Sequence, residues 1–251
     1  MKKGLKIFLG IIGGLAAAGL LFWLVFPGLP SYWAAKKMFS YQDTVLSDYP
    51  YMQLGTPSDY KPLTELGLQL MVPQSTEKVN QKSSIPVYSN KENKSADEKM
   101  LAVAFLDHSS TADMEMIGEE GFTQEEFDRG IRGIRRERPS NNYECWNMIY
   151  NITPADYNYH KHGTWKFFLQ VMKMKDELYP SVGQVGYHFE TDAAKGFVFE
   201  YGKPDGENEN YALLIELYEK DDPNRCHGAI IKSADYKMLK QIANSAQVVP
   251  E

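Results

Sequence analysis

The sequence predicts an α+β protein in which one N-terminal transmembrane helix precedes an antiparallel β-sheet flanked by helices. Three observations lead to this fold class. Residues 7–26 read IFLGIIGGLAAAGLLFWLVF and contain no charge. Strand-like segments separated by turn-forming residues follow one another between residues 184 and 232. Segments with helical spacing of apolar residues, 123–138 and 233–246, lie before and after those strands in the chain.

The apolar run is long enough to cross a membrane. As a helix, residues 7–26 would extend about 30 Å, the thickness of a bilayer's hydrocarbon core. A cleaved signal peptide is the alternative, because Lys2, Lys3 and Lys6 precede the run. The run is longer than a signal peptide needs, and bulky residues occupy the positions after Phe26 where cleavage requires small ones. We therefore expect an uncleaved signal anchor.

Flanking charge predicts the orientation of this span. Lysines next to a span tend to stay in the cytoplasm. More lysines precede the run than follow it, where only Lys36 and Lys37 are near. We expect a single-pass protein of the cell (inner) membrane with a cytoplasmic N-terminus and an extracytoplasmic C-terminal domain. Trp23, Tyr32 and Trp33 suit an aromatic belt at the outer boundary.

Small residues form a stripe along the span. Gly10, Gly14 and Ala18 follow one another at intervals of four residues, so they lie on one helix face. Such a face allows close packing against a second helix. A span rich in glycine and alanine also produces such a stripe by chance, and both interpretations stay open.

Composition limits the kinds of partner. We expect an anchor at residues 1–28, a juxtamembrane helix and linker at 29–62, and one extracytoplasmic domain at 63–251. The net charge is -6, and basic residues are scattered among acidic ones. This argues against nucleic acid as a partner. The expected partners are the membrane and a protein of the envelope.

The first segment after the span predicts a second helix. Pro27, Gly28 and Pro30 should break the first helix, and Ser31 should cap another that runs to about Leu46. The proline- and tyrosine-rich stretch 49–62 has no sustained period, which is typical of a linker.

Strands and one helix are expected next. Apolar residues alternate from Leu66 to Val72, and further strands are expected at 84–88 and 100–106. Thr123 and Glu126 form a capping box that opens a helix ending before Pro139. Arginines at 129–138 complement the helix dipole and need no ligand, although an anion or partner site is an alternative.

The last part of the chain predicts an antiparallel meander. Residues 143–150 resemble a strand, and a helix follows Thr164. Four strands are then expected at 184–190, 196–201, 211–219 and 226–232, with hairpin turns at 203–210 and 221–224. Ser233 should cap a closing helix with these residues inward: Tyr236, Leu239, Ile242, Ala243 and Ala246.

The order of these parts resembles the PsbP-like fold superfamily. The resemblance covers residues 63–249 and is carried by LGLQLMVP at 66–73 and by LKQIANSAQVV at 239–249. It implies an α/β/α sandwich, an antiparallel sheet covered by helices on both sides. It also implies an accessory or binding protein, because this superfamily shares no catalytic residues. The membrane anchor and the long segment 151–180 depart from the family pattern.

Histidines and cysteines are the candidate site residues. His160 and His162 would point to one side of an extended segment and are candidate metal ligands. No spacing motif supplies a third ligand, so exposed loop histidines are the alternative. Cys145 and Cys226 could form a disulfide closing a loop of roughly 80 residues, worth about 4 kcal/mol, or remain two separate buried thiols. A metal or catalytic role for them is a third possibility.

No other segment predicts a specific chemistry. His227 should point away from its neighbour Cys226 on a strand. Residues 107–110 contain Asp, His and Ser but are consecutive, unlike a catalytic triad. The acidic residues 205, 207 and 209 lack the register of a calcium loop. We expect no cofactor and no identifiable catalytic site. The predicted function is a membrane-anchored binding or assembly protein of a bacterial cell envelope. The alternatives are an envelope hydrolase or metal-dependent enzyme, and a structural subunit of a membrane complex.

Overall fold

The chain forms two compact units. The computed structural model describes residues 2–51, 57–79, 84–90, 100–107, 123–182, 185–201 and 211–249, with the backbone alone at 2–11, 13, 107, 124 and 180–182. The first unit comprises residues 1–44, 117–138 and 152–176, and the second comprises 45–116, 139–151 and 177–251. The sheets lie in the second unit.

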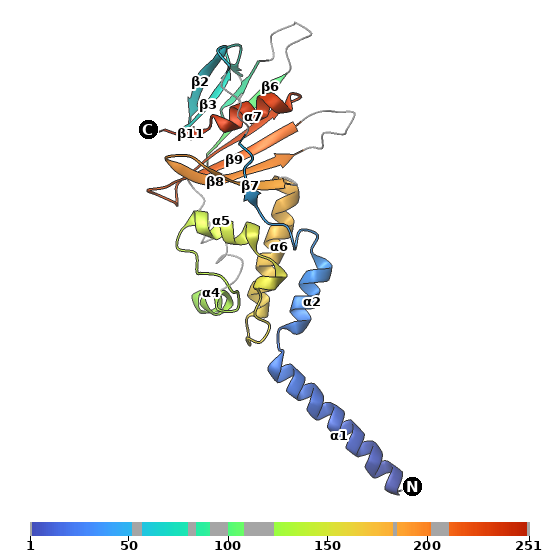
Figure 1. Ribbon diagram of the computed structural model, residues 1–251. Coiled ribbons are helices and arrows are strands. Elements are labelled where there is room, and N and C mark those ends of the chain that lie inside the picture. Colours follow the sequence, from blue (N-terminus) through green and yellow to red (C-terminus); the bar gives the residue numbers. More distant parts are fainter. Residues whose placement is uncertain are drawn as a thin grey trace. The chain divides into compact units, whose positions relative to one another are not determined.

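The described part of the first unit is helical (Figure 1). Its elements are α1 (Lys2–Val25), α2 (Leu29–Met38), α4 (Gln124–Ile131), the 3-10 helix η1 (Pro154–Asp156) and most of α6 (Trp165–Val182). The unit ends within α6, at Asp176.

α1 contains the apolar run up to Val25. Among the described residues, no single helix has both the length and the apolarity needed to cross a membrane. The part Gly14–Val25 and α2 meet both requirements together, and they are bent by 72° at the break between them. Length and composition of this kind fit a broken span, a re-entrant loop or a signal sequence.

α2 begins and ends earlier than the sequence predicts. Gly28 is its N-cap, and Pro30 lies in the first turn, where a missing amide hydrogen costs nothing. The helix ends at Met38 and not near residue 46. The amides of Ser40 and Tyr41 instead donate to the carboxylate of Asp176 at 2.6 and 3.0 Å. These bonds draw the chain out of the helix.

The capping box of α4 is confirmed. The Glu126 amide donates to the Thr123 hydroxyl at 3.2 Å, and the Thr123 amide donates to the Glu126 carboxylate at 2.9 Å. The helix ends at Ile131, several residues before the predicted end, because Ile134 forms an antiparallel bridge with Tyr157. Tertiary pairing therefore ends this helix before Pro139 can.

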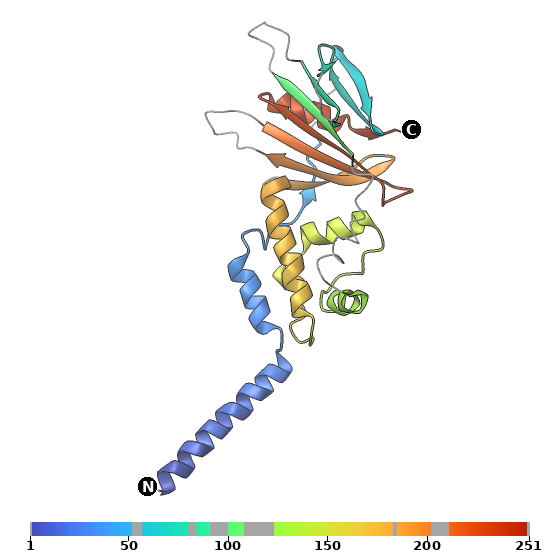
Figure 2. The same ribbon diagram turned by 180° about the vertical axis from the view of Figure 1, so that it is seen from behind.

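The second unit contains a large mixed sheet and a small one (Figures 1 and 2). The strands of the large sheet, in spatial order, are β1 (Ser47–Asp48), β7 (Val185–Glu190), β8 (Ala194–Tyr201), β9 (Tyr211–Glu219), β10 (Cys226–Ser233), β6 (Leu101–Asp107), β5 (Val87–Ser89) and β4 (Glu77–Lys78). The small sheet has the order β11 (Gln247–Val248), β3 (Leu68–Pro73), β2 (Tyr60–Glu65).

The predicted meander is confirmed. β7, β8, β9 and β10 are consecutive neighbours and pair antiparallel. Only the β1–β7 pair among the described strands is parallel. The fold class is therefore α+β with a mixed, mostly antiparallel sheet flanked by helices, as predicted at that level.

The predicted linker contains a strand. β2 begins at Tyr60 within the stretch 49–62, and it pairs with β3 through a turn at Leu66 and Gly67. Both turn residues have positive φ, 49° and 74°. The strand predicted from the apolar alternation therefore begins too early, at Leu66, whereas β3 (Leu68–Pro73) begins at Leu68. A leucine in the left-handed region is uncommon, and its carbonyl accepts a hydrogen bond from the His227 ring at 2.7 Å.

Residues 143–150 form a helix, which corrects the predicted strand. α5 runs Asn142–Asn151. The Glu144 amide donates to the Asn141 side chain at 2.9 Å, which caps the first turn. Cys145, Met148 and Ile149 are buried at helical spacing. The aromatic residues in this segment have a high propensity for strands, but the Asn141 cap and the burial of one helix face stabilise a helix instead.

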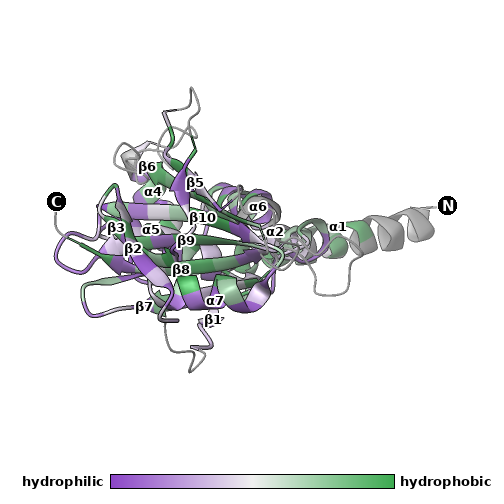
Figure 3. Cartoon of the chain, turned by 90° about the horizontal axis from the view of Figure 1, so that it is seen from above, coloured by the Kyte–Doolittle hydropathy of each residue, from purple (hydrophilic) through white to green (hydrophobic). Residues whose placement is uncertain are grey.

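Helices lie against both faces of the large sheet. α7 (Tyr236–Asn244) buries Leu239 and Ile242 in the core that Ile215 and Ala229 form on one face. The alternate residues of β8 point to the other face, where Phe197 and Phe199 contact Tyr150 of α5. Figure 3 shows the mainly hydrophobic central strands.

The closing helix differs in detail from its prediction. Its N-cap is Asp235, which accepts from the Met238 amide at 3.1 Å, and not Ser233. Tyr236 is 38% exposed, whereas the sequence places it inward. The other predicted inward residues, Leu239, Ile242, Ala243 and Ala246, are buried.

Candidate functional site: the edge of β7 and the seat of α1

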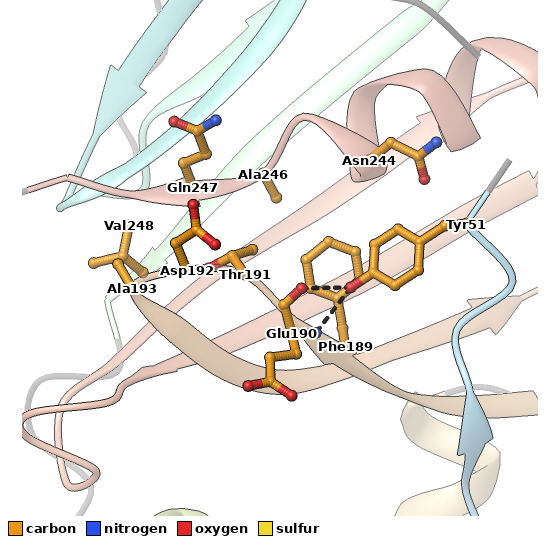
Figure 4. A pocket seen from close by; sticks show the side chains of 10 residues that line it. All are labelled: Tyr51, Phe189, Glu190, Thr191, Asp192, Ala193, Asn244, Ala246, Gln247 and Val248. Carbon is orange, nitrogen blue, oxygen red and sulfur yellow. Dashed lines mark hydrogen bonds between the residues drawn. The ribbon is translucent and has the colours of Figure 1, made fainter. Parts of the chain in front are cut away.

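Tyr51 covers the end of strand β7. Its hydroxyl donates to the carbonyl of Glu190 at 2.5 Å and accepts from the amide of the same residue at 2.9 Å (Figure 4). One side chain therefore satisfies the two backbone groups that a further strand would bind. β1 pairs with only two residues of β7, and Pro50 follows shortly after it. Pro50 cannot donate a backbone hydrogen bond, so Tyr51 replaces the continued strand.

Two pockets adjoin this contact. The first has a volume of about 340 Å³ and is lined by Tyr51, Phe189, Glu190, Thr191, Asp192, Ala193, Asn244, Ala246, Gln247 and Val248 (Figure 4). The second has a volume of about 380 Å³ and is lined by Asp48, Tyr49, Tyr51, Tyr143, His188, Phe189, Glu190 and Lys195. Tyr51, Phe189 and Glu190 line both pockets. We call these three residues the edge ridge.

Charges around the ridge are mixed. Glu190 pairs with Lys220 at 2.7 Å, and this hydrogen bond and charge lower the pKa of Glu190. In the second pocket, burial lowers the pKa of His188, and the nearby carboxylate of Asp48 partly opposes that effect. His188 is therefore neutral at pH 7 and can accept or donate a hydrogen bond. The first pocket carries acidic side chains, and the second carries both signs.

A buried lysine contacts Tyr49, one of the residues that line the second pocket. Lys240 of α7 is 1% exposed and pairs with the carboxylate of Glu200. Its ammonium lies 4.5, 5.1 and 5.3 Å from the ring centroids of Tyr49, Tyr187 and Tyr236. Burial and the charge of Glu200 raise the pKa of Tyr49, so its hydroxyl stays neutral. Cation–π contacts of a desolvated ammonium hold these side chains in one arrangement.

In the first unit, a loop receives the end of α1. The Gly28 amide donates to the Tyr159 carbonyl at 2.8 Å, and the His160 ring donates through Nδ1 to the Val25 carbonyl at 2.8 Å. The ring of Phe26 lies 6.1 Å from that of Tyr159 and 5.0 Å from that of His160. Carbonyls at a helix end lack intrahelical donors, so His160 satisfies one of them. We call Tyr157, Tyr159 and His160 the anchor seat.

Gly28 is required at this seat. A Cβ on Gly28 would collide with the ring and hydroxyl of Tyr157. That ring stacks on Phe168 of α6, with centroids 4.2 Å apart and an interplanar angle of 4°. It therefore cannot move aside without disturbing the core of the unit. The connection between α1 and α2 is thus packed into the folded unit.

The histidines predicted as metal candidates lie in this loop. Residues 158–163 form turns and not an extended segment, so His160 and His162 do not share one side of a strand. The His162 ring lies 6.4 Å from that of Trp23. Among the described residues, no three side chains of metal-ligand type come together. The sequence signal for the contact of His160 with the end of α1 was its position among aromatic residues in a loop, 157–163, that contains no acid.

The cysteines are two buried thiols of the second unit. Cys145 lies on α5 and is fully buried, and Cys226 lies on β10 and is 7% exposed. They form no disulfide in this structure, and the disulfide stays a prediction for experiment. His227 faces away from Cys226 and lies between the Glu219 carboxylate, 2.8 Å from Nε2, and the Leu66 carbonyl.

The remaining candidates are exposed, paired or outside the described residues. Gly14 and Ala18 are exposed on α1, and a Cβ on Gly14 would meet no atom within 4 Å. Gly10 is described by its backbone alone. Residues 108–110 and the acidic residues 205, 207 and 209 lie outside the described chain. Three of the predicted arginines form ion pairs: Arg129 with Glu125, Arg136 with Asp156, and Arg138 with Asp128.

The edge ridge was missed in the sequence. Tyr51 lies in a stretch that reads as a linker, and Glu190 ends an ordinary strand. The available signal was the order Tyr-Pro-Tyr at 49–51, which joins two large aromatic rings to a residue without an amide hydrogen. No protein-family model matches the chain, and no curated protein matches it.

Proposed function

We propose that this is a membrane-anchored protein of a bacterial envelope whose extracytoplasmic domain binds, or helps assemble, a protein partner. α1 would cross the membrane once with its N-terminus in the cytoplasm. The finer fold assignment, a PsbP-like α/β/α sandwich, belongs to the same proposal. It is supported by helices on both faces of the sheet and by the closing helix, and it agrees with an accessory role.

The observation that supports a retained anchor is the set of contacts between the end of α1 and the anchor seat. A signal peptide that is cleaved has no need for a specific contact with the mature fold. Here Val25, Phe26 and Gly28 make hydrogen bonds and ring contacts with the anchor seat. Cleavage after the apolar run would remove or disrupt these contacts. This favours retention of α1 as part of the folded protein.

The edge ridge supports a binding role. Binding pockets combine apolar walls with a few polar groups. The second pocket has this composition, whereas the first is more polar. The residues that the two pockets share are held by backbone hydrogen bonds and by neighbouring rings. An exposed tyrosine is a typical anchor residue of protein interfaces, and Tyr51 is 53% exposed.

Localisation and cleavage can be tested together. The full-length protein with a C-terminal tag should remain in the membrane pellet after alkaline carbonate extraction. Its intact mass should equal that of the uncleaved chain, 28.6 kDa before the tag is added. Protease added outside the cytoplasmic membrane should remove the tag. A soluble product, or one shortened by the apolar run, would contradict the anchor.

The partner can be tested by purification in mild detergent. We expect a reproducible set of co-purifying envelope proteins with the wild type and its loss with Tyr51→Ala combined with Asp192→Lys. Lys232→Glu is the matched control, because Lys232 is exposed on β10 and lines neither pocket. If the ridge variant and the control variant recover equal amounts of the co-purifying proteins, the edge ridge does not bind the partner.

One observation favours the enzyme alternative. The second pocket contains His188, whose lowered pKa suits a general base, together with the acid Asp48. Among the described residues that line the pocket, no serine, threonine or cysteine is present to act as a nucleophile. A hydrolase would therefore have to activate water. Turnover of model esters or phosphodiesters that His188→Ala abolishes would establish this function.

The structural-subunit alternative depends on the small-residue stripe. Gly14 has space for a side chain, so a partner helix could pack there. Gly14→Cys should then form crosslinks in membranes. Monomer-only products would contradict this alternative.

A further inference from the structure

Exposed tryptophans and lysines lie on both sides of the anchor seat. They are Trp33, Lys36 and Lys37 of α2, Lys161 of the loop before α6, and Trp165 and Lys166 at the start of α6. We call these residues the basic collar. Trp33 is 54% exposed and Trp165 is 44% exposed. Tryptophan side chains are on average highly buried in folded proteins, so the exposure of these two requires an explanation.

The collar has a charge unlike that of the whole chain. The segments 26–38 and 157–169 contain these four lysines and two histidines and no aspartate or glutamate. The whole chain has a net charge of -6. Glu126 of α4 lies near Lys166 and offsets part of its charge. Neither segment itself contains an acidic side chain, so the four lysines together still attract anions.

Contacts place the collar at the end of α1. Tyr159 and His160 touch Phe26, and the His162 ring lies close to Trp23. The loop before α6 and the junction of α1 with α2 lie side by side in Figures 1 and 2. If α1 spans the bilayer, Trp23 and Phe26 lie near its outer boundary. The loop that carries Lys161 must then lie at the level of the lipid head groups.

The bend after α1 turns α2 toward the membrane plane. α2 makes an angle of 72° with the Gly14–Val25 part of α1. For a span near the membrane normal, α2 then lies closer to the plane than to the normal. One side of α2 is buried through Ala35, and Trp33, Lys36 and Lys37 are exposed. Tryptophan and lysine are the residue types that settle at the interface between head groups and acyl chains.

We propose that the basic collar binds the head groups of anionic phospholipids on the outer face of the membrane. This inference rests on the proposed anchor. Lipid is favoured over an acidic protein because the collar continues directly from the apolar helix and combines tryptophans with lysines. The contact would fix the orientation of the first unit on the bilayer, since both α2 and the start of α6 take part.

The test uses the full-length protein reconstituted in vesicles of equal amounts of phosphatidylcholine and phosphatidylglycerol. In one preparation the neutral lipid carries bromine in its acyl chains, and in the other the anionic lipid does. Bromine quenches tryptophans at short range, so the ratio of quenching reports which lipid surrounds Trp23, Trp33 and Trp165, the three tryptophans of the first unit. Trp146, stacked on Tyr150 in the second unit, supplies a constant background.

We expect brominated phosphatidylglycerol to quench the wild type more strongly, with an apparent preference of at least about threefold. Lys36→Glu combined with Lys37→Glu should reduce the preference to about one, and so should Lys161→Glu with Lys166→Glu, because both pairs lose attraction for the anionic lipid. Lys232→Glu with Lys237→Glu makes the same charge change on exposed residues of the second unit and should behave as the wild type. High salt should lower the preference of the wild type.

The outcomes distinguish a failure of lipid binding by the basic collar from a failure of membrane anchoring by α1. Equal quenching by the two lipids in wild-type protein that resists carbonate extraction would overturn the collar and leave the anchor intact. A preference that survives both collar variants would also overturn it. Protein that does not stay in the vesicles would contradict the anchor itself. Circular dichroism of each variant establishes that it is folded, and the salt dependence of the wild type tests the collar without a substitution.

Discussion

At the scale of single residues, several polar side chains form hydrogen bonds with backbone groups that would otherwise pair with other backbone groups. The Tyr51 hydroxyl occupies the hydrogen-bonding groups of Glu190, and the His160 ring serves a carbonyl at the end of α1. His227 likewise bonds the carbonyl of Leu66 in a strained turn. Each of these residues satisfies backbone groups where a regular element stops, so each position is sensitive to small chemical changes.

Tyr51→Phe should destabilise the edge of β7. The change keeps the ring and removes the hydroxyl, so the amide and carbonyl of Glu190 lose their partner. We expect a loss of about 1 kcal/mol of unfolding free energy, because water replaces the hydroxyl at this half-exposed position. Chemical denaturation of the full chain in detergent measures the loss, and amide exchange at Glu190 should accelerate.

Tyr60→Phe is the matched control for this change. It removes a hydroxyl for which the described part of the chain shows no hydrogen bond. It should leave the free energy within about 0.5 kcal/mol of the wild-type value. An equal loss in both variants would mean that the contact with Glu190 contributes nothing.

Lys175 should make stability depend on pH. Its ammonium is buried and donates to the carbonyls of Thr44 and Ile152. Burial lowers its pKa to about 8 from an ordinary value of 10.5, and the charge of Arg136 adds to this effect. Above pH 8 the folded state has lost this proton while the unfolded state still holds it. Stability from this group therefore rises with pH and is lowest below pH 8.

The prediction is a gain of about 1–2 kcal/mol in unfolding free energy between pH 8 and roughly 9.5, before tyrosines ionise. Lys175→Met should abolish this gain while lowering stability overall, because the two carbonyls lose their donor. Denaturation curves of both proteins across this range provide the measurement. Parallel pH profiles for wild type and variant would show that Lys175 is not the group responsible.

At the scale of elements, the sequence predicted long periodic segments and missed short ones. The strands β7 to β10 were predicted within two residues at each end, because their apolar residues and turns agree with the final pairing. α5 was predicted as a strand, since its tyrosines and tryptophan outweighed the capping Asn141. β2 was missed because its apolar alternation is interrupted by Pro62 and lysine.

Long-range contacts account for the remaining differences. α2 ends where Asp176 binds the following amides, and α4 ends where Ile134 pairs with Tyr157. The edge ridge joins Tyr51 to Glu190 across 139 positions of the chain. Periodicity within a short segment carries no information about a contact between residues so far apart in the chain. The candidate site therefore could not be predicted, whereas most of the sheet could.

Gly28→Ala should weaken the junction of α1 and α2. The added methyl group would collide with Tyr157, whose ring is held by stacking on Phe168. We expect a loss of about 1–3 kcal/mol, as for other insertions into packed sites. Limited proteolysis between residues 26 and 29 should become faster in detergent. Gly14→Ala, at a position with open space, is the control and should change neither quantity.

At the scale of the whole molecule, the two units have different tasks under the proposal. The first unit carries the hydrophobic helix and its seat, and the second carries the sheets, the edge ridge and both cysteines. α6 belongs to both, with Asp176 as the last residue of the first unit. Because the cysteines lie in the second unit only, their reactivity reports the opening of that unit and not of the first.

Cys145 and Cys226 should therefore react with a maleimide only when the second unit unfolds. Both thiols are buried, in a helix and in a central strand respectively, so local fluctuations expose them rarely. In the native full-length protein we expect labelling at least about a hundredfold slower than at an exposed cysteine introduced by Ala193→Cys. Increasing denaturant should label both thiols in the same transition if the unit opens cooperatively. Labelling of one thiol well before the other would show that the unit does not open cooperatively, and a disulfide in protein isolated under oxidising conditions would contradict the two-thiol state.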